Sequence, residues 1–163
     1  MKIIKKILDL IQLLTEYVLF VMVAAMVVIV FAQVIWRFIL HASLPWSEEA
    51  ARYLMVWMSM LGSSIALRKK GHIGVEALVM LFPAPVKKAV SFLTTLVAAG
   101  FFVGIIHYGI KVLKVVAPQE SPAMEISMAI PYGALVVGGV LMLLYSIEEL
   151  NALISSNKGG AHS

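Results

Sequence analysis

The chain of 163 residues contains no cysteine and few charged residues. Without cysteine it can form no disulfide, thiolate zinc site or iron–sulfur cluster, and it has no thiol nucleophile. Only 13% of the residues are Asp, Glu, Lys or Arg, against about 25% in ordinary soluble domains. So few polar groups cannot cover the surface of a water-soluble fold in which 61% of the residues are hydrophobic. The composition therefore excludes a soluble globular domain and indicates a membrane protein.

Long stretches with little or no charge predict four transmembrane helices. A helix needs about 20 residues to cross a hydrocarbon core about 30 Å thick. The predicted spans are residues 17–40, 45–68, 87–110 and 126–149. Pro45, followed by two acidic residues, is typical of a helix start. We therefore expect an all-α integral membrane protein with one domain, residues 1–154.

Three shorter segments complete this organisation. Residues 72–82 are apolar but would extend only about 16 Å as a helix, so we expect a short interfacial helix there, with a plain loop as the alternative. The basic residues around it are expected to be lipid-headgroup anchors: Arg68, Lys69, Lys70, Lys87 and Lys88. Residues 3–14 form an amphipathic lead-in to a retained first helix. Residues 155–163 are expected to be a disordered tail.

The distribution of Lys and Arg predicts the orientation. The N-terminus, the middle connection and the tail together carry Lys2, Lys5, Lys6, Arg68, Lys69, Lys70, Lys87, Lys88 and Lys158. The opposite side carries only Arg37, Arg52, Lys111 and Lys114. Because cytoplasmic loops are richer in Lys and Arg, both termini should be cytoplasmic. Nucleic acid is not expected as a partner, since the cations lie in short clusters beside apolar runs.

The spans lack the groups that most membrane chemistry requires. Ion coupling needs an ionisable residue or an unwound polar helix near the middle of the bilayer, and neither is visible. The histidines do not oppose one another at matching depth, as a haem-binding bundle would require. We therefore expect no enzyme activity, no cofactor and no metal. Gln33 lies one turn before Arg37, so both face either another protein helix or the headgroup region.

Small residues four positions apart predict close helix packing. The pairs are Ser59 with Ser63, Gly100 with Gly104, and Ala134 with Gly138. Such spacing lets helix backbones approach closely in lipid. Packing within the chain and packing on a partner are both consistent with these pairs.

The densest polar cluster is SLPWSEEAARY, residues 43–53. On a helix, Glu48 and Glu49 lie four and three positions before Arg52, so their charges can compensate one another while Trp46 anchors at the interface. The cluster is either the start of the second helix or a docking patch for another protein.

Four motifs together resemble a known family. They are QVIWRF (33–38), SLPWSEEAARY (43–53), LGSSIALRKKGHIGVEAL (61–78) and PQESPAMEISMAIPYG (118–133). In this order, over residues 17–150, the chain resembles the small membrane subunit, of DctQ type, of tripartite ATP-independent periplasmic (TRAP) transporters. The match makes Trp46, Glu48, Glu49, Arg52 and His72 signature positions with structural or docking roles.

The resemblance implies a scaffold subunit in a bacterial inner membrane. It would act in a sodium-driven importer of organic acids, such as C4-dicarboxylates or sialic acid. The implied partners are a large membrane subunit, expected here as a separate chain, a periplasmic substrate-binding protein, and membrane lipids. The alternative is an independent small carrier or channel acting as a homo-oligomer, which would need a polar path through the spans.

Overall fold

Four long α-helices make up the described part of the chain. The computed structural model describes residues 2–69 and 84–158. The helices are α1 (Lys2–Ile39), α2 (Pro45–Arg68), α4 (Ala84–Val116) and α5 (Ala129–Lys158). Each contains an apolar window long enough to cross a membrane. This confirms the predicted all-α integral membrane class with four spanning helices. The expected interfacial helix at 72–82, His72 and Lys70 lie outside the described residues.

The ends of α1 and α2 follow from local sequence. No glycine or proline interrupts residues 2–39, so the amphipathic lead-in and the first span form one continuous helix. After α1 the chain turns at His41, which has a positive φ of 48°, and the Ala42 N–H donates to the Trp36 carbonyl at 3.3 Å. Pro45 then begins α2, where its missing N–H costs no helical hydrogen bond.

The last helix is shifted toward the C-terminus relative to the prediction. It begins at Ala129 rather than 126, because the Ser127 Oγ accepts from the Ala129 N–H at 3.2 Å and so caps the helix there. Residues 126–128 belong to the preceding loop. At the other end α5 continues to Lys158, so residues 155–158, which we expected to be disordered, are helical.

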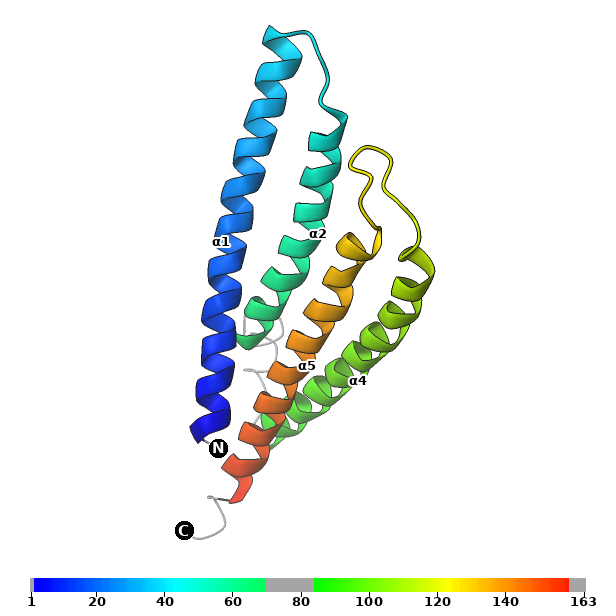
Figure 1. Cartoon of the computed structure of the whole chain (residues 1–163). Helices are drawn as coiled ribbons and strands as arrows, with labels where there is room; N and C mark the ends of the chain where they lie inside the picture. Colours follow the sequence, from blue (N-terminus) through cyan, green and yellow to red (C-terminus); the bar gives the residue numbers. More distant parts are fainter. Residues whose placement is uncertain (1, 70–83, 159–163) are drawn as a thin grey trace.

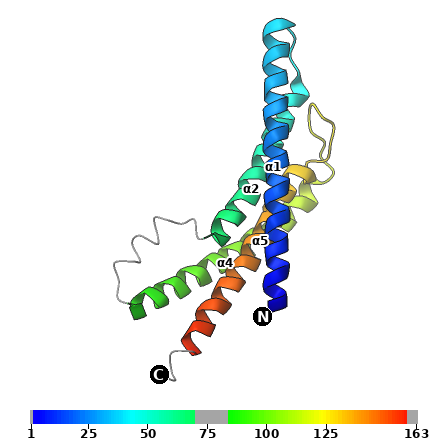
Figure 2. The ribbon, with the colours of Figure 1, turned by 90° about the vertical axis from the view of Figure 1, so that its left-hand side faces the viewer.

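The helices form one layer in the order α1, α2, α5, α4 (Figure 1). Each packs mainly on its neighbours in this order, so α1 and α4 are edge helices. Viewed from the side, α4 and α5 are inclined to α1 (Figure 2). We call the end that holds the start of α1 and the end of α2 the termini end. The opposite end, which holds residues 40–44 and 117–128, is the loop end.

The core of the layer lies along α5, and small residues allow its helices to approach. Ala134 and Ser64 are fully buried between α2 and α5. A Cβ added at Gly138 would lie 2.8 Å from the Met60 Cβ, and one at Gly109 would lie 2.9 Å from the Val136 Cγ2. Both distances are shorter than normal carbon contacts, so glycine is required for the observed spacing.

Candidate functional site: two polar junctions

At the termini end, the Arg68 guanidinium joins three helices. From α2 it donates to the Glu148 carboxylate of α5 from Nε at 2.9 Å and from a terminal nitrogen at 3.1 Å. Toward α1 it donates to Asp9 Oδ1 at 2.6 Å, to Gln12 Oε1 at 2.6 Å and to the Leu8 carbonyl at 2.9 Å. All five N–H donors are therefore used, in the planar fork that only arginine provides. We call this cluster the termini-end junction.

An aromatic side chain covers this junction. The Arg68 guanidinium carbon lies 5.0 Å from the centre of the Tyr145 ring, which permits a cation–π interaction. Tyr145 is 3% exposed, and its hydroxyl makes no hydrogen bond within the described ranges 2–69 and 84–158. The Arg68 side chain is 10% exposed. The guanidinium therefore makes its contacts within the chain.

The expected headgroup anchors thus divide into two groups. Arg68 is not an anchor in this structure, because Asp9, Glu148 and their neighbours use its donors. Lys69 is more exposed and forms an ion pair of 2.9 Å with Glu16 of α1. Lys87 and Lys88 are exposed on α4, where they can still reach lipid headgroups.

At the loop end, the Glu49 carboxylate holds the connection between α4 and α5. Its Oε2 accepts from the Ala123 and Met124 backbone N–H groups at 2.9 Å each. Its Oε1 accepts from the Tyr53 hydroxyl one helical turn away. Glu49 is 3% exposed. We call Glu49, Tyr53 and residues 121–124 the loop-end junction.

The held loop has an ordered backbone of its own. The Gln119 backbone carbonyl accepts from the Met128 N–H at 2.9 Å, and the Ser121 N–H donates to the Ile126 carbonyl at 2.9 Å. Ser127 Oγ donates to the Ala117 carbonyl at 2.7 Å. Glu125 has a positive φ of 54°, which completes the turn. The two amides that bind Glu49 are thus presented by a closed loop.

The polar side chains near the α1–α2 connection pair differently from the prediction. Gln33 Nε2 donates to Glu48 Oε1 at 3.2 Å, which links α1 to α2. Neither Glu48 nor Glu49 forms an ion pair with Arg52 in the part of the chain that the structure describes. Glu48 accepts instead from Gln33 of α1, and Glu49 accepts from Tyr53 of α2 and from two amides of the loop before α5. Arg37, Trp46 and Arg52 are exposed.

Two contributors to the loop end were not predicted. Tyr53 supplies its hydroxyl to Glu49, and Trp57 donates its Nε1–H to the Ile130 carbonyl at 3.1 Å. The Trp57 bond anchors the first turn of α5 on α2. A polar-tipped aromatic residue one or two turns after a buried carboxylate is the only sequence signal for these roles.

The predicted small-residue pairs lie in different surroundings. Ala134 and Gly138 lie in the α2–α5 interface. Ser59 and Ser63 are exposed, whereas Ser64, one residue later, is buried. Apart from their neighbours and the nearby backbone of α4, no atom of the described chain lies within 4 Å of a Cβ added at Gly100 or Gly104. Those two glycines therefore do not pack on another helix among the described residues.

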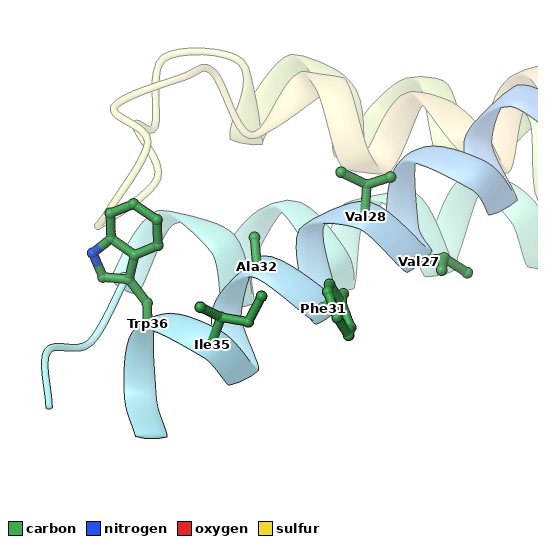
Figure 3. Close-up of a pocket in the computed structure, with 6 residues that line it drawn as sticks. All are labelled: Val27, Val28, Phe31, Ala32, Ile35 and Trp36. Carbon is green, nitrogen blue, oxygen red and sulfur yellow. The ribbon is translucent and has the colours of Figure 1, made fainter. Parts of the chain in front are cut away.

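An apolar groove lies on α1 (Figure 3). It is open, has a volume of about 290 Å³ and is lined by Val27, Val28, Phe31, Ala32, Ile35 and Trp36. Its lining carries no charged side chain, and its one side-chain donor is the Trp36 Nε1–H, so no cation is present there to bind a carboxylate. Residues 2–69 and 84–158 also contain no group of three or more His, Asp or Glu side chains placed to hold a metal ion. The polar chemistry of the described chain is concentrated in the two junctions.

Comparisons with known proteins show that the sequence is similar to those of membrane transport subunits. The family model described as "Tripartite ATP-independent periplasmic transporters, DctQ component" matches residues 26–155. The sialic acid TRAP transporter permease protein SiaT of Haemophilus influenzae is 35% identical over 74% of this chain and 20% of its own length. The C4-dicarboxylate TRAP transporter small permease protein DctQ of Vibrio cholerae is 30% identical over 45% of this chain and 32% of its own length.

A further relative matches over most of its length. The sialic acid TRAP transporter small permease protein SiaQ of Vibrio cholerae is 26% identical over 92% of this chain and 85% of that protein. By contrast, the chain spans only about a fifth of SiaT and about a third of the Vibrio DctQ protein.

Proposed function

The chain belongs to the DctQ component family of tripartite ATP-independent periplasmic transporters, and from this premise we propose that it is the scaffold subunit of a sodium-driven importer of organic acids. The relatives are transporter permease subunits rather than enzymes. The chain is a multi-pass inner-membrane protein. Its proposed partners are a large membrane subunit, which carries the sodium and substrate sites, and a periplasmic substrate-binding protein.

The observation that carries this proposal is the spacing of the two junctions on α2. Glu49 and Arg68 are 19 residues apart on one helix, which corresponds to about 28 Å and matches a hydrocarbon core of about 30 Å. Residues 54–67, between them, contain no ionisable side chain. An element fixed at both membrane surfaces, with an apolar middle, suits a fixed support for a moving carrier better than a transport path.

The proposed orientation places the termini end in the cytoplasm. The nine Lys and Arg residues counted on that side, against four on the other, support this orientation. The loop-end junction then faces the periplasm, where a soluble binding protein would arrive. The exposed signature residues Trp46, Glu48 and Arg52 lie at that end as the proposed docking patch, and buried Glu49 orders the loop beside them. His72 is proposed to share this signature role on the cytoplasmic side.

The substrate class comes from the relatives. SiaT is a sialic acid transporter permease and the Vibrio DctQ protein belongs to a C4-dicarboxylate transporter, and both substrates are organic acids. Because the groove on α1 is lined by apolar side chains and one tryptophan, with no charged group, we assign recognition of the acid to the partner subunits.

Reconstitution tests the proposal. Proteoliposomes containing this chain alone should show no sodium-dependent uptake of sialic acid or C4-dicarboxylates. Vesicles that also contain the large subunit, with the binding protein outside and an inward sodium gradient, should take up one of these acids. Saturable uptake by this chain alone would contradict the scaffold role and favour an independent homo-oligomeric carrier.

A further inference from the structure

Near the loop end, the outer face of α4 carries three basic side chains. Helix α4 is at the edge of the layer and packs mainly on α5 (Figure 1). Its inner face holds Phe102, which is buried, and Gly109, where an added Cβ would lie 2.9 Å from a side chain of α5. His107, Lys111 and Lys114 are exposed. At 100° per residue they lie about 140–160° around the helix from Gly109. We call these three residues the basic face of α4.

The two lysines of the basic face have no acidic partner among the residues that the structure describes. Helix α4 contains neither Asp nor Glu, and neither Lys111 nor Lys114 forms an ion pair with another described residue. At the termini end, by contrast, Lys69 pairs with Glu16 of α1 at 2.9 Å. The sequence also places fewer Lys and Arg residues at the loop end than at the termini end. Lys111 and Lys114 are therefore open to an anion from outside the chain.

Tyr108 holds part of the basic face in place. Its ring centre lies 5.4 Å from the Lys111 Nζ, which permits a cation–π interaction. The same ring lies 5.3 Å from that of His107, with the two planes at 79°. An ammonium group has three N–H donors, so one above a ring can still donate to an acceptor beside it. Tyr108 is 67% exposed, and tyrosine is common at membrane–water interfaces. The cluster thus presents hydrogen-bond donors at the depth of a membrane surface.

The position of the basic face along α4 fits the phosphates of a lipid leaflet. From Lys88 to Lys111 the helix rises about 34 Å, slightly more than a hydrocarbon core of about 30 Å. Residues 89–106 contain no ionisable side chain. On the side of the basic face, Gly100 and Gly104 leave the surface of α4 low, because they carry no side chain and no other helix of the described chain lies close to them. An anion bound at this depth with an apolar body below it would match this surface.

We propose that the basic face of α4 binds the phosphate of an anionic phospholipid in the leaflet at the loop end, and that an acyl chain of this lipid lies over Gly100 and Gly104. The negative charge of the lipid complements the two ammonium groups, and each lysine near a membrane surface strengthens binding of anionic lipid about fivefold. An acidic soluble protein is a poorer match, because it would have to displace the phosphates that already lie at this depth. The inference requires no partner subunit, so it does not depend on the proposed function.

Fluorescence quenching on the full chain in nanodiscs tests the proposal. The chain has no cysteine, so Gly104→Cys and Val28→Cys each provide one site for a fluorophore. Val28 is exposed on α1, the other edge helix, and serves as the reference position. Two nanodisc preparations have the same mixture of phosphatidylcholine with a minority of phosphatidylglycerol, and an equal amount of one lipid or the other carries a nitroxide on its acyl chain. At position 104, labelled phosphatidylglycerol should quench at least about threefold more than labelled phosphatidylcholine. At position 28 the two lipids should quench within about twofold of each other.

Two double variants test the role of the lysines. Lys111→Gln with Lys114→Gln should reduce the preference at position 104 to that at position 28, because the anion then loses both cations. Lys87→Gln with Lys88→Gln, the matched control, makes the same charge change at the other end of α4, about 24 Å from position 104, and should change the preference less than about twofold. Far-UV circular dichroism checks that each variant retains its helices.

Four results would overturn the inference. Equal quenching by the two lipids at position 104 would mean that the face contacts only bulk lipid, and an equal preference at position 28 would mean that it is not specific to α4. Persistence of the preference in the Lys111 and Lys114 double variant would exclude those lysines as the cause. Absence of quenching by either lipid would mean that protein, such as a second copy of the chain, covers the face.

Discussion

Each of the two junctions binds other parts of the chain to α2, one through a carboxylate and the other through a cation. At the loop end a carboxylate, Glu49, accepts hydrogen bonds from two loop amides and a neighbouring tyrosine, and it forms no ion pair with the described residues. At the termini end a cation, Arg68, donates to two carboxylates, an amide oxygen and a carbonyl on two other helices. One junction orders a loop, and the other joins helices.

This difference decides which substitutions each junction tolerates. Glu49 needs acceptor atoms in the right place, and a neutral amide of the same shape retains an oxygen for the loop amides. Arg68 needs five donors in one plane, and no other side chain supplies them. We therefore expect the loop end to depend on shape and the termini end to depend on arginine itself.

The largest expected effect is that of Arg68→Lys. Lysine keeps the charge but cannot reach Glu148, Asp9 and Gln12 together, so several charge-assisted bonds are lost. Because Asp9 and Glu148 are partly exposed, the loss of stability should be about 2–3 kcal/mol, below that of a fully buried pair. Thermal unfolding in nanodiscs should show a melting temperature lower by about 5–10 °C. A Tm within about 1 °C of the unchanged chain would show that charge alone suffices there.

The next effect is that of Glu49→Ala compared with Glu49→Gln. Alanine leaves the amides of Ala123 and Met124 and the Tyr53 hydroxyl without their acceptor, so Tm should fall by about 4–6 °C. Glutamine should lower Tm by no more than about 2 °C. Hydrogen exchange provides a local readout, since the amides of residues 123 and 124 should exchange much faster in the alanine variant alone. An equal fall in Tm for the alanine and glutamine variants would mean that the loop-end junction depends on the charge of Glu49. The two junctions would then not differ in what they require.

The smallest effects belong to the exposed cations beside each junction. Lys69→Gln removes an ion pair with Glu16 in which both side chains are well exposed, and Arg52→Gln removes a cation without an ion-pair partner in the described chain. Each variant should change Tm by less than about 2 °C, because exposed ion pairs contribute little. A larger loss for Arg52→Gln in the isolated chain would restore the predicted pairing with Glu48 or Glu49. Loss of partner binding without loss of Tm would instead support the docking patch.

Local pattern and composition were sufficient to predict the helices. Long uncharged stretches predicted four spans, and Pro45 marked the start of α2. The resemblance to DctQ subunits was confirmed by the family match over residues 26–155. These features depend on neighbouring residues, which sequence periodicity reports directly.

The junctions could not be predicted because their partners are distant in sequence. Glu49 bonds to residues 74 and 75 positions later, and Arg68 pairs with Glu148, 80 positions later. Local spacing pointed instead to Arg52 as the partner of Glu48 and Glu49, and to the membrane as the partner of Arg68. In the described structure Glu48 and Glu49 bond to groups other than Arg52, and Asp9 of α1 and Glu148 of α5 use donors of Arg68 that were predicted to bind lipid headgroups.

In the proposed function, the two junctions support a carrier without taking part in transport. The most direct test is sodium-driven uptake by the reconstituted complex containing Arg68→Lys, normalised to the amount of assembled complex. Total uptake should fall with assembly, while uptake per assembled complex and the KM for the transported acid should stay within about twofold of the unchanged complex. A changed KM, or a large loss of uptake per complex at full assembly, would contradict the claim.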